Sequence, residues 1–533
     1  MRLVHHYLIE SAQRYPDKIA LICDKKPWSY TELVRRVYLL SAALVDVGLQ
    51  KGDRALVLLS DKSEFLAACY AVMKGGGIAV PLPEGDALPS VEEIAHNCTP
   101  SILITSRRNL ARFPLLRDKL GCKFLIVEDP NAADDSDSMG GYTRAMANMV
   151  LFGANKMSGA EDRGEPIGLV EDDGATLLFA SGAAGKKKGV LLSHRNLVKA
   201  TLNINGFVGI DSSIREFVGI PLTNSSGFGR TCCVHFVGGT MVVNNGLLNP
   251  IALIESVLKH QCDAISAMPS GLALFFGRLE ALLQRIGPQI RFIELGSAFM
   301  PLDHKMRLLD IFPNARICMH YGLAEASRST FLDFGKERRK LHTVGRALPS
   351  VSLRIIDDLG RRVGHLETGE VLLKGDHVAA RYWDDVELDR QCYTSDGWFK
   401  TGDYGFVDEE GYLHLLGRKD EMINMVDLKI SPVEVEERIH ELYPDCEICV
   451  VGIPDPAGIV GEIPVLCYTA KNGITITPSD LSHGLASRLD RSKIPRVVYR
   501  VESIPRTEDE KIMRRELRRR IFIGSTQEME EVH

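Results

Sequence analysis

The most informative segment of this chain is Leu177-Leu-Phe-Ala-Ser-Gly-Ala-Ala-Gly-Lys-Lys-Lys-Gly-Val-Leu-Leu-Ser-His194. An apolar segment leads into a loop with three glycines and three lysines, and a helix is expected to begin near Ser193. Glycine lets backbone N–H groups come close to a polyphosphate, and lysine supplies the opposing charge. The loop is not a Walker A motif, which has four residues between its glycines, because only two separate Gly182 from Gly185. The segment predicts a phosphate-binding loop; the alternative is a flexible basic turn.

Helix-like and strand-like patterns alternate before this loop. Apolar residues recur at helical spacing from Leu33 to Leu49, with a helix end at Gly48, and a strand-like run follows over Arg54–Leu59. Phe65–Met73 has the composition of a buried helix, and three glycines separate it from a second strand-like run at Ile78–Leu82. This alternation predicts parallel α/β layers.

Length and composition predict more than one domain. The chain has 533 residues, of which 45% are hydrophobic and 25% charged, as in ordinary globular proteins. A single hydrophobic core stops growing at roughly 250–300 residues, so at least two domains are expected. Shorter β-like segments lie at Val351–Ile356 and Glu370–Lys374, and a compact α+β module is expected from Gly417 onward. The Asp-, Ser- and Gly-rich stretch from Asp129 to Pro166 predicts a long surface excursion.

Several classes of protein are excluded by the same numbers. A net charge of −6 offers no general attraction for nucleic acid. The longest apolar stretches are about half of the roughly 20 residues that a membrane span needs, and no apolar segment follows Arg2 as a secretory signal would require. The twelve cysteines are scattered through apolar runs, and Cys446-x-x-Cys449 lacks further metal ligands nearby. We therefore expect free thiols and a cytoplasmic protein.

The glycine- and lysine-rich segment resembles the signature loop of the adenylate-forming superfamily, which includes acyl- and aryl-CoA ligases, adenylation domains and luciferases. Four more segments resemble the other motifs of this superfamily and follow in its order. They are His320-Tyr-Gly-Leu-Ala-Glu325, Asp396-Gly-Trp-Phe-Lys-Thr-Gly-Asp403, Gly417-Arg-Lys-Asp420 and Ile504-Pro-Arg-Thr-Glu-Asp-Glu-Lys-Ile-Met-Arg514. The resemblance covers nearly the whole chain.

The resemblance implies an α/β fold in two parts. Residues 1–416 would form a large N-terminal AMP-binding domain of layered α/β subdomains with a β-barrel-like portion. Residues 417–533 would form a small, mobile α+β domain that rotates about a hinge at Asp420.

The resemblance also implies roles for individual residues. Lys511, Lys188 and Glu325 would be catalytic, with Glu325 holding Mg²⁺ because carboxylate oxygen suits this hard cation. Tyr321 would lie against the adenine, Asp403 would bind the ribose hydroxyls, and Arg418 would contact ribose or phosphate. The remaining nucleotide-binding residues would be Ser181, Gly182, Gly185, Lys186, Gly189 and Gly322.

The acid-binding site is less well defined by the sequence. Asn224 aligns where an aromatic residue or histidine usually borders the acyl site, and Gly296-Ser297-Ala298 align with the glycine-rich wall of that site. No acidic residue stands where amino-acid-activating domains hold an ammonium group. Together with Phe228, Phe299 and Leu323, this favours an apolar or aromatic acid.

Several positions depart from the superfamily pattern. Alanine replaces threonine or serine at Ala180, Ala183, Ala184 and Ala324, Asp427 replaces a glycine beside the expected thiol route, and Glu510 replaces the glycine before Lys511. Each lost hydrogen bond to a charged phosphate could cost about 1.5–3 kcal/mol. Lys187 replaces a proline and could supply compensating charge.

The activity that the resemblance implies is ATP- and Mg²⁺-dependent activation of a small carboxylic acid to an acyl-adenylate. Pyrophosphate is released, and the acyl group passes to a phosphopantetheine thiol of CoA or of a carrier protein. Two alternatives remain open: an enzyme that stops at the adenylate or uses a non-thiol acceptor, which Asp427 suggests, and a degenerate paralogue that binds a nucleotide or a partner, which the alanines suggest. The acid, the choice of acceptor, the pathway and the oligomeric state do not follow from the sequence.

Overall fold

The structure is a computed structural model. It describes residues 2–23, 26–83, 88–112, 122–127, 149–152, 164–181, 187–244, 249–277, 279–296, 300–425, 428–456, 459–470, 473–507, 512–523 and 529–532. Most of the surface excursion expected from Asp129 to Pro166 lies outside these residues.

An eight-stranded sheet contains the predicted loop segment. Its order is β19-β9-β8-β4-β3-β5-β6-β7, and its strands are β3 (Arg54–Leu58), β4 (Ile78–Pro81), β5 (Ile102–Thr105), β6 (Lys123–Val127), β7 (Met149–Phe152), β8 (Gly174–Ser181), β9 (Lys187–Ser193) and β19 (Arg381–Tyr382). The strands from β8 to β7 run parallel, and β9 pairs antiparallel with both β8 and β19. The loop therefore connects two strands of a hairpin, and the predicted helix begins after the second of them.

A nine-stranded sheet forms the other half of the large domain. Its order is β16-β15-β14-β13-β12-β10-β11-β1-β2, and its strands are β1 (Ile19–Cys23), β2 (Lys26–Ser29), β10 (Arg215–Val218), β11 (Thr240–Val243), β12 (Ala264–Ala267), β13 (Phe292–Leu295), β14 (Arg316–Tyr321), β15 (Thr330–Asp333) and β16 (Arg346–Ala347). The six strands from β14 to β1 are parallel, and antiparallel strands flank them. This is the parallel α/β layering that the sequence predicts.

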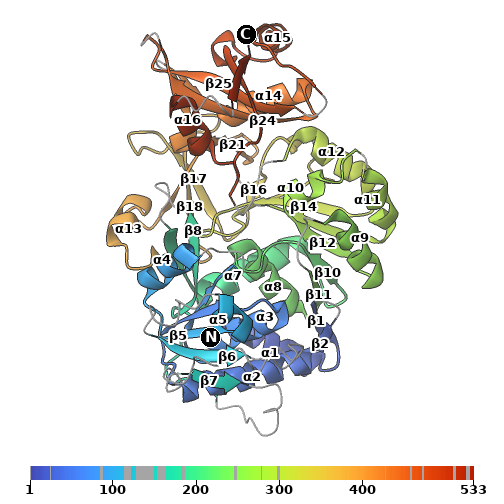
Figure 1. Cartoon of the computed structure of the whole chain (residues 1–533), viewed down its shortest axis with the longest axis vertical. Coiled ribbons are helices and arrows are strands. Elements are labelled where there is room, and N and C mark those ends of the chain that lie inside the picture. Colours follow the sequence, from blue (N-terminus) through green and yellow to red (C-terminus); the bar gives the residue numbers. More distant parts are fainter. Residues whose placement is uncertain are drawn as a thin grey trace.

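Helices fill the space between the two sheets and cover their outer faces (Figure 1). The main core combines apolar side chains of both sheets with those of α1 (Val4–Arg14), α2 (Tyr30–Asp46), α3 (Lys62–Lys74), α7 (His194–Val208) and α8 (Ser225–Val237). The outer helices are α4 (Leu88–Cys98) and α5 (Arg107–Arg112) by the first sheet, and α9 (Pro250–Lys259), α10 (Pro269–Ala273), α11 (Glu280–Ile286) and α12 (Leu302–Ile311) by the second.

Local signals explain where these helices begin and end. Ser29 caps α2 by accepting a hydrogen bond from the Glu32 backbone, while the Glu32 side chain accepts from the Ser29 backbone. Gly48, with φ +96°, follows α2 in the left-handed conformation that glycine adopts without strain. Every residue of α3 from Ser63 to Lys74 is buried, as its apolar composition predicts.

The region expected to be barrel-like is a four-stranded antiparallel sheet. It contains β17 (Ser352–Ile356), β18 (Gly369–Lys374), β20 (Phe399–Val407) and β21 (Leu413–Arg418), and α13 (Val386–Cys392) precedes β20. Short 3-10 helices lie at Gly287–Gln289, Arg338–Lys340, Lys419–Glu421 and Arg491–Lys493.

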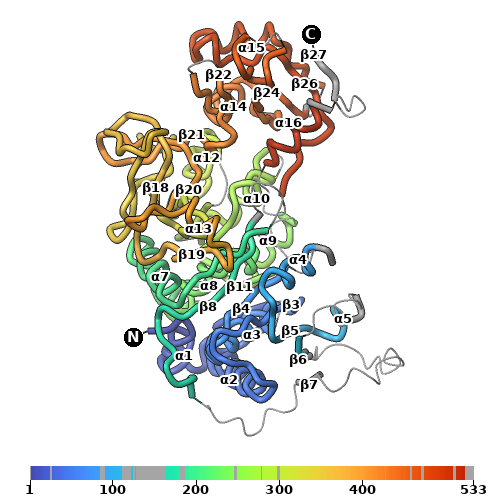
Figure 2. The backbone as a smooth tube through the Cα atoms, turned by 90° about the vertical axis from the view of Figure 1, so that its left-hand side faces the viewer, coloured from blue at the N-terminus to red at the C-terminus, as the bar shows by residue number. Residues whose placement is uncertain are grey.

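The C-terminal residues form a smaller α+β body at one end of the molecule (Figure 2). Its elements are β22 (Ile423–Met425), β23 (Leu428–Ile430), α14 (Pro432–Leu442), β24 (Cys446–Pro454), β25 (Glu462–Ala470), α15 (Pro478–Leu485), β26 (Val497–Val501), α16 (Arg514–Ile523) and β27 (Met529–Val532). It has its own apolar clusters. The two cysteines of the Cys446-x-x-Cys449 pair are free buried thiols, as are all the other cysteines except Cys392, a free thiol that is partly exposed.

Candidate active site

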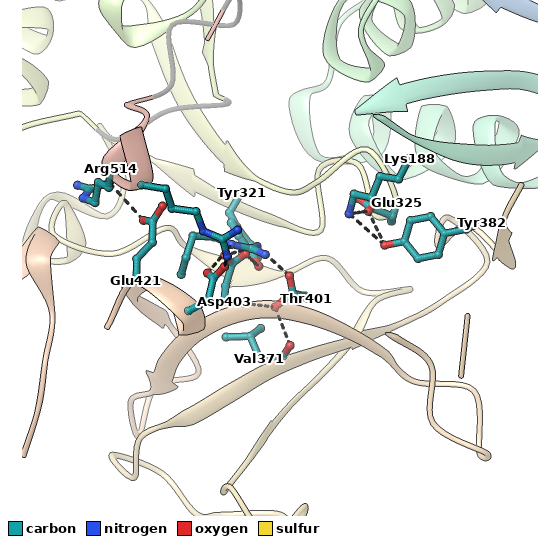
Figure 3. A network of polar contacts seen from close by, with 12 residues as sticks. Lys188, Tyr321, Glu325, Val371, Tyr382, Thr401, Asp403, Glu421 and Arg514 are labelled. Carbon is teal, nitrogen blue, oxygen red and sulfur yellow. Dashed lines mark hydrogen bonds and ion pairs between the residues drawn. The ribbon is translucent and has the colours of Figure 1, made fainter. Parts of the chain in front are cut away.

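One group of side chains joins three strands (Figure 3). Tyr321 ends β14, Asp403 lies in β20 and Arg418 ends β21. The Tyr321 hydroxyl donates to Asp403 Oδ2 at 2.6 Å, and Arg418 Nη1 donates to Asp403 Oδ1 at 2.8 Å. Burial and the adjacent Asp403 charge raise the pKa of Tyr321 well above its usual value, so its hydroxyl stays a donor. The carboxylate of Asp403 is therefore held in place from both sides.

The backbone around Asp403 is fixed as well. Thr401 Oγ1 donates to the Val371 carbonyl at 2.7 Å and accepts from the Asp403 amide at 3.0 Å. Arg418 Nη1 donates to the Thr401 carbonyl at 2.9 Å. Gly402 has φ +70°, and a Cβ there would stand 2.7 Å from the Arg418 guanidinium, so the sequence Thr-Gly-Asp suits this turn.

A second group surrounds Glu325, which is almost fully buried. Lys188 Nζ donates to Glu325 Oε1 at 2.6 Å, and the Tyr382 hydroxyl donates to the same oxygen at 2.6 Å. Burial raises the pKa of Glu325, but the charge of Lys188 and the hydrogen bonds from Lys188 and Tyr382 outweigh this, so the pKa is lowered overall. Glu325 is thus a carboxylate paired with a partly exposed lysine.

The two groups meet on one short segment of chain. Tyr321 is the last residue of β14, and Glu325 follows it four residues later. Gly322 between them lies so close to the following turn that a Cβ would be 2.3 Å from the Arg328 amide nitrogen. The segment therefore connects the Asp403 group with the Lys188 group in a tightly packed turn.

The predicted loop is only partly described. Ala180 pairs with Lys188 and Ser181 with Lys187 across the β8–β9 hairpin, and a Cβ at Gly189 would be 3.1 Å from Leu177 and Trp383 atoms. Six of the residues proposed for the site lie outside the described part of the chain: Gly182, Gly185, Lys186, Lys511, Ser297 and Ala298. The departures at Ala183, Ala184, Asp427 and Glu510, and Phe299 at the acyl wall, lie outside it too.

The described residues proposed for the acid site have structural partners. Asn224 caps α8, with its Oδ1 accepting from the Gly227 amide at 2.8 Å. A Cβ at Gly296 would stand 2.1 Å from the His320 ring, so His320 fills the space beside this glycine. Leu323 is partly buried against the main core, in the turn that holds Tyr321 and Glu325.

The expected hinge is tied to the small domain by charge. Asp420 forms an ion pair with Arg515 of α16, and Arg418 Nε lies 3.9 Å from the Asp420 carboxylate. Lys429, in β23, donates to Asp358 of the large domain at 2.6 Å. These contacts describe one orientation of the small domain.

Two features were not anticipated from the sequence. The first is Tyr382, which reaches Glu325 from the short strand β19. The second is a fully buried chain of charges beneath the site: Arg230 pairs with Glu216 at 2.6 Å and with Glu294 at 2.9 Å, and Glu294 also accepts from Arg328 at 2.5 Å. A sequence signal for the second was available, because Glu294 interrupts the otherwise apolar strand Phe292-Ile-Glu-Leu295.

Both groups lie at the carboxyl end of the parallel strand β14, where α/β sheets commonly bind ligands. Comparison with known proteins gives the family. The family model described as "AMP-binding enzyme" matches residues 8–383, and the model described as "AMP-binding enzyme C-terminal domain" matches residues 434–511. The chain belongs to the AMP-binding enzymes, and the predicted superfamily is confirmed, together with the predicted fold.

The relatives are acid–CoA ligases of similar length. The feruloyl-CoA synthase of Amycolatopsis sp is 27% identical over 516 residues, covering 96% of this chain and 98% of the relative. The 2-succinylbenzoate–CoA ligase of Bacillus velezensis is 29% identical over 519 residues, covering 96% and 97%. Among solved structures, ATP-bound MatB from Rhodopseudomonas palustris has a TM-score of 0.84 at 25% identity and covers 97% of this chain and 98% of its own. Within the described part of this chain, none of the helices is both long and apolar enough to cross a membrane.

Proposed function

We propose that this protein activates a small carboxylic acid with ATP and transfers the acyl group to the phosphopantetheine thiol of CoA or of a carrier protein. The observation that supports this most directly is the turn that carries both Tyr321 and Glu325. It joins a carboxylate suited to ribose hydroxyls, Asp403, with a cation–carboxylate pair suited to phosphate and metal. Family membership supports the same reaction, because the relatives named above are CoA ligases.

The adenosine end of ATP would bind at the first group. Tyr321 offers an aromatic face to the adenine, and Asp403 accepts from the ribose hydroxyls. Each carboxylate has about four lone-pair positions, so Asp403 can serve Tyr321, Arg418 and the ribose together.

The phosphate end would bind at the second group. In the protein alone Lys188 and Glu325 neutralise each other. Polyphosphate would compete for the Lys188 ammonium, leaving the Glu325 carboxylate for Mg²⁺, whose preferred ligands are oxygens. When bound, Mg²⁺ supplies positive charge that offsets the phosphate charge. Tyr382, which donates to Glu325, would keep the carboxylate oriented.

The chemistry then needs little more than positioning and charge. A carboxylate oxygen of the acid attacks the α-phosphorus, the bond to the β-phosphate oxygen breaks, and pyrophosphate leaves. We infer that Lys511 stabilises this step and that the small domain, from residue 417, then turns at Asp420. The thiol sulfur attacks the acyl carbon, AMP leaves with the bonding electrons, and the thiol proton passes to solvent.

Exchange of labelled pyrophosphate into ATP, measured against a panel of apolar and aromatic acids, tests this proposal. We expect exchange with at least one acid, its loss in Lys511→Ala, and its retention in the control Lys493→Ala, whose lysine pairs with Glu434 on the small domain. Thioester formation with CoA, or with a carrier protein, then identifies the acceptor.

Other results would support one of the alternatives. Exchange without any thioester would indicate an enzyme that stops at the adenylate or uses a non-thiol acceptor. ATP binding without exchange for any acid would contradict the proposed activity and favour a nucleotide-binding paralogue.

A further inference from the structure

Within the part of the chain that the structure describes, two clusters of histidine and carboxylate side chains lie outside the site. In the first, His5 and His6 of α1 point both Nε2 atoms at Glu165 Oε1, at 2.7 and 2.6 Å. The Leu3 amide donates to His6 Nδ1 at 3.1 Å, so a neutral His6 has its proton on Nε2 and donates it to Glu165. Its three side chains are joined by short hydrogen bonds, although His5 Nδ1 is buried and has no partner among the described residues. His6 could bind a metal through Nε2 only by giving up its contact with Leu3.

The second cluster spans the two domains. Asp303 and His304 begin α12 of the large domain, and His440 lies near the end of α14 of the small domain. The His304 Nε2–Asp303 Oδ2 separation is 3.8 Å and the His440 Nε2–Asp303 Oδ1 separation is 3.9 Å, and one ligand atom from each of the three residues lies within 4.8 Å of the other two. The two imidazole rings meet edge to face, with centroids 5.7 Å apart.

The contacts within this cluster are longer than those within the first. All its separations exceed hydrogen-bonding distance. His440 Nε2 is buried, and none of the described residues forms a hydrogen bond with it. A buried ring nitrogen without a partner is costly, and it faces a carboxylate and a second imidazole. A group that bonds to all three at once would remove that cost.

We propose that Asp303, His304 and His440 bind a divalent transition-metal ion of the zinc type between the two domains. Zn²⁺ bonds to histidine nitrogen at about 2.0–2.1 Å and to carboxylate oxygen at about 2.0–2.2 Å, which places tetrahedral ligands roughly 3.4 Å apart. The His304 and His440 nitrogens lie 3.8 and 3.9 Å from different oxygens of the Asp303 carboxylate, so each separation needs to close by about 0.5 Å as the carboxylate turns toward the ion. Two imidazoles and one carboxylate favour zinc over Mg²⁺, which prefers oxygen ligands. Asp303 is half exposed, so water can complete the coordination.

Binding at this position has a consequence for the orientation of the domains. The ion would take ligands from both domains only in the orientation seen here. By mass action, free metal at about 100 times its dissociation constant would raise the population of this orientation, relative to the other orientations, roughly 100-fold. The ion would therefore hold the small domain in place. Its effect on turnover depends on the proposed function, because only there is the small domain required to turn.

Metal binding can be measured on the full chain without any acid substrate. The protein is treated with a chelator and titrated with Co²⁺, followed by its visible absorption, and with Zn²⁺ in competition with a coloured chelator. We expect one equivalent per chain, weakened at least tenfold in both His304→Gln and His440→Gln. The matched controls are His6→Gln, from the clamp, and His483→Gln, from the exposed surface of α15. Circular dichroism shows that the variants are folded.

A second measurement reports on the domains. Zn²⁺ should slow tryptic cleavage around Lys419, beside the expected hinge, in the wild type and not in His440→Gln. The inference is overturned if binding is absent or equal in wild type and both variants, or if only His6→Gln loses it. It is also overturned if Zn²⁺ binds but protects wild type and His440→Gln alike. None of these results depends on acid activation, so this inference and the proposed function can fail separately.

Discussion

Replacing Tyr382 with phenylalanine removes one oxygen atom from the active site and nothing else. The lost hydroxyl donates to Glu325 Oε1 at 2.6 Å, alongside Lys188 Nζ, which also lies 3.2 Å from the Tyr382 oxygen. A hydrogen bond to a buried charged group contributes about 1.5–3 kcal/mol, which corresponds to roughly 10- to 150-fold in an equilibrium constant. Loss of a group that orients a metal-binding carboxylate typically costs about 10- to 100-fold in metal affinity. We therefore expect Mg²⁺-dependent ATP binding to weaken roughly 10- to 100-fold.

Calorimetry separates this effect from a general loss of the site. ATP is titrated at several Mg²⁺ concentrations, and AMP serves as a ligand that reaches Asp403 without the terminal phosphates. In Tyr382→Phe the AMP affinity should change less than about twofold. Tyr393→Phe is the control, because its hydroxyl donates at 2.6 Å to a neutral carbonyl, that of Ala379. An ATP affinity that changes equally in both variants, or by less than twofold in Tyr382→Phe, would refute the reasoning.

Three other substitutions test separate parts of the structure. Asp403→Asn should weaken AMP binding roughly 10- to 150-fold by calorimetry, whereas Asp396→Asn on the exposed turn should not. Arg230→Met leaves Glu294 short of a buried partner and should lower the unfolding free energy by about 3–5 kcal/mol in chemical denaturation; a loss below about 1 kcal/mol would contradict this. Hydrogen bonds from two histidines lower the pKa of Glu165 from 4.5 to about 2, so its carboxylate stabilises the fold above pH 4.5 and less as the pH falls toward 2. Glu165→Gln should flatten that acid-side decline in the unfolding midpoint, and parallel curves would be the opposite outcome.

Several residues that the sequence selected lie together in the structure. Lys188, Tyr321, Glu325, Asp403 and Arg418 are spread over more than 200 residues, and the structure brings them into two adjacent groups. They could be selected because each lies in a motif with a recognisable spacing. The layered sheets were predictable too, because alternation of apolar helices and strands depends on local pattern.

Other parts depended on contacts between distant segments. The strand β9 was not predicted, because a short segment that begins with two lysines shows no strand pattern until it pairs with β8 and β19. Tyr382 belongs to a strand of two residues, for which periodicity gives no signal. Arginine is usually found at the protein surface, and the burial of Arg230 depends on its ion pairs with Glu216 and Glu294.

Asn224 illustrates a different limit of the sequence. It was selected because it aligns with a position bordering the acyl site, and in the structure its side chain caps α8. A cap and a pocket wall can occupy the same position, and alignment does not separate them. The fit of His320 beside Gly296 likewise followed only from the packed structure.

The tight turn after β14 has a consequence for energetics. Gly322 leaves no room for a Cβ beside Arg328, so the turn is closely packed, and we expect a displacement at Tyr321 to be felt at Glu325. A change in the position of the adenine at Tyr321 would then disturb the Mg²⁺ at Glu325, and a change at the Mg²⁺ would disturb the adenine. When fragments of the nucleotide are bound separately, their binding free energies should therefore not add up to the binding free energy of the intact nucleotide. The difference measures the coupling free energy between the two ends of the site.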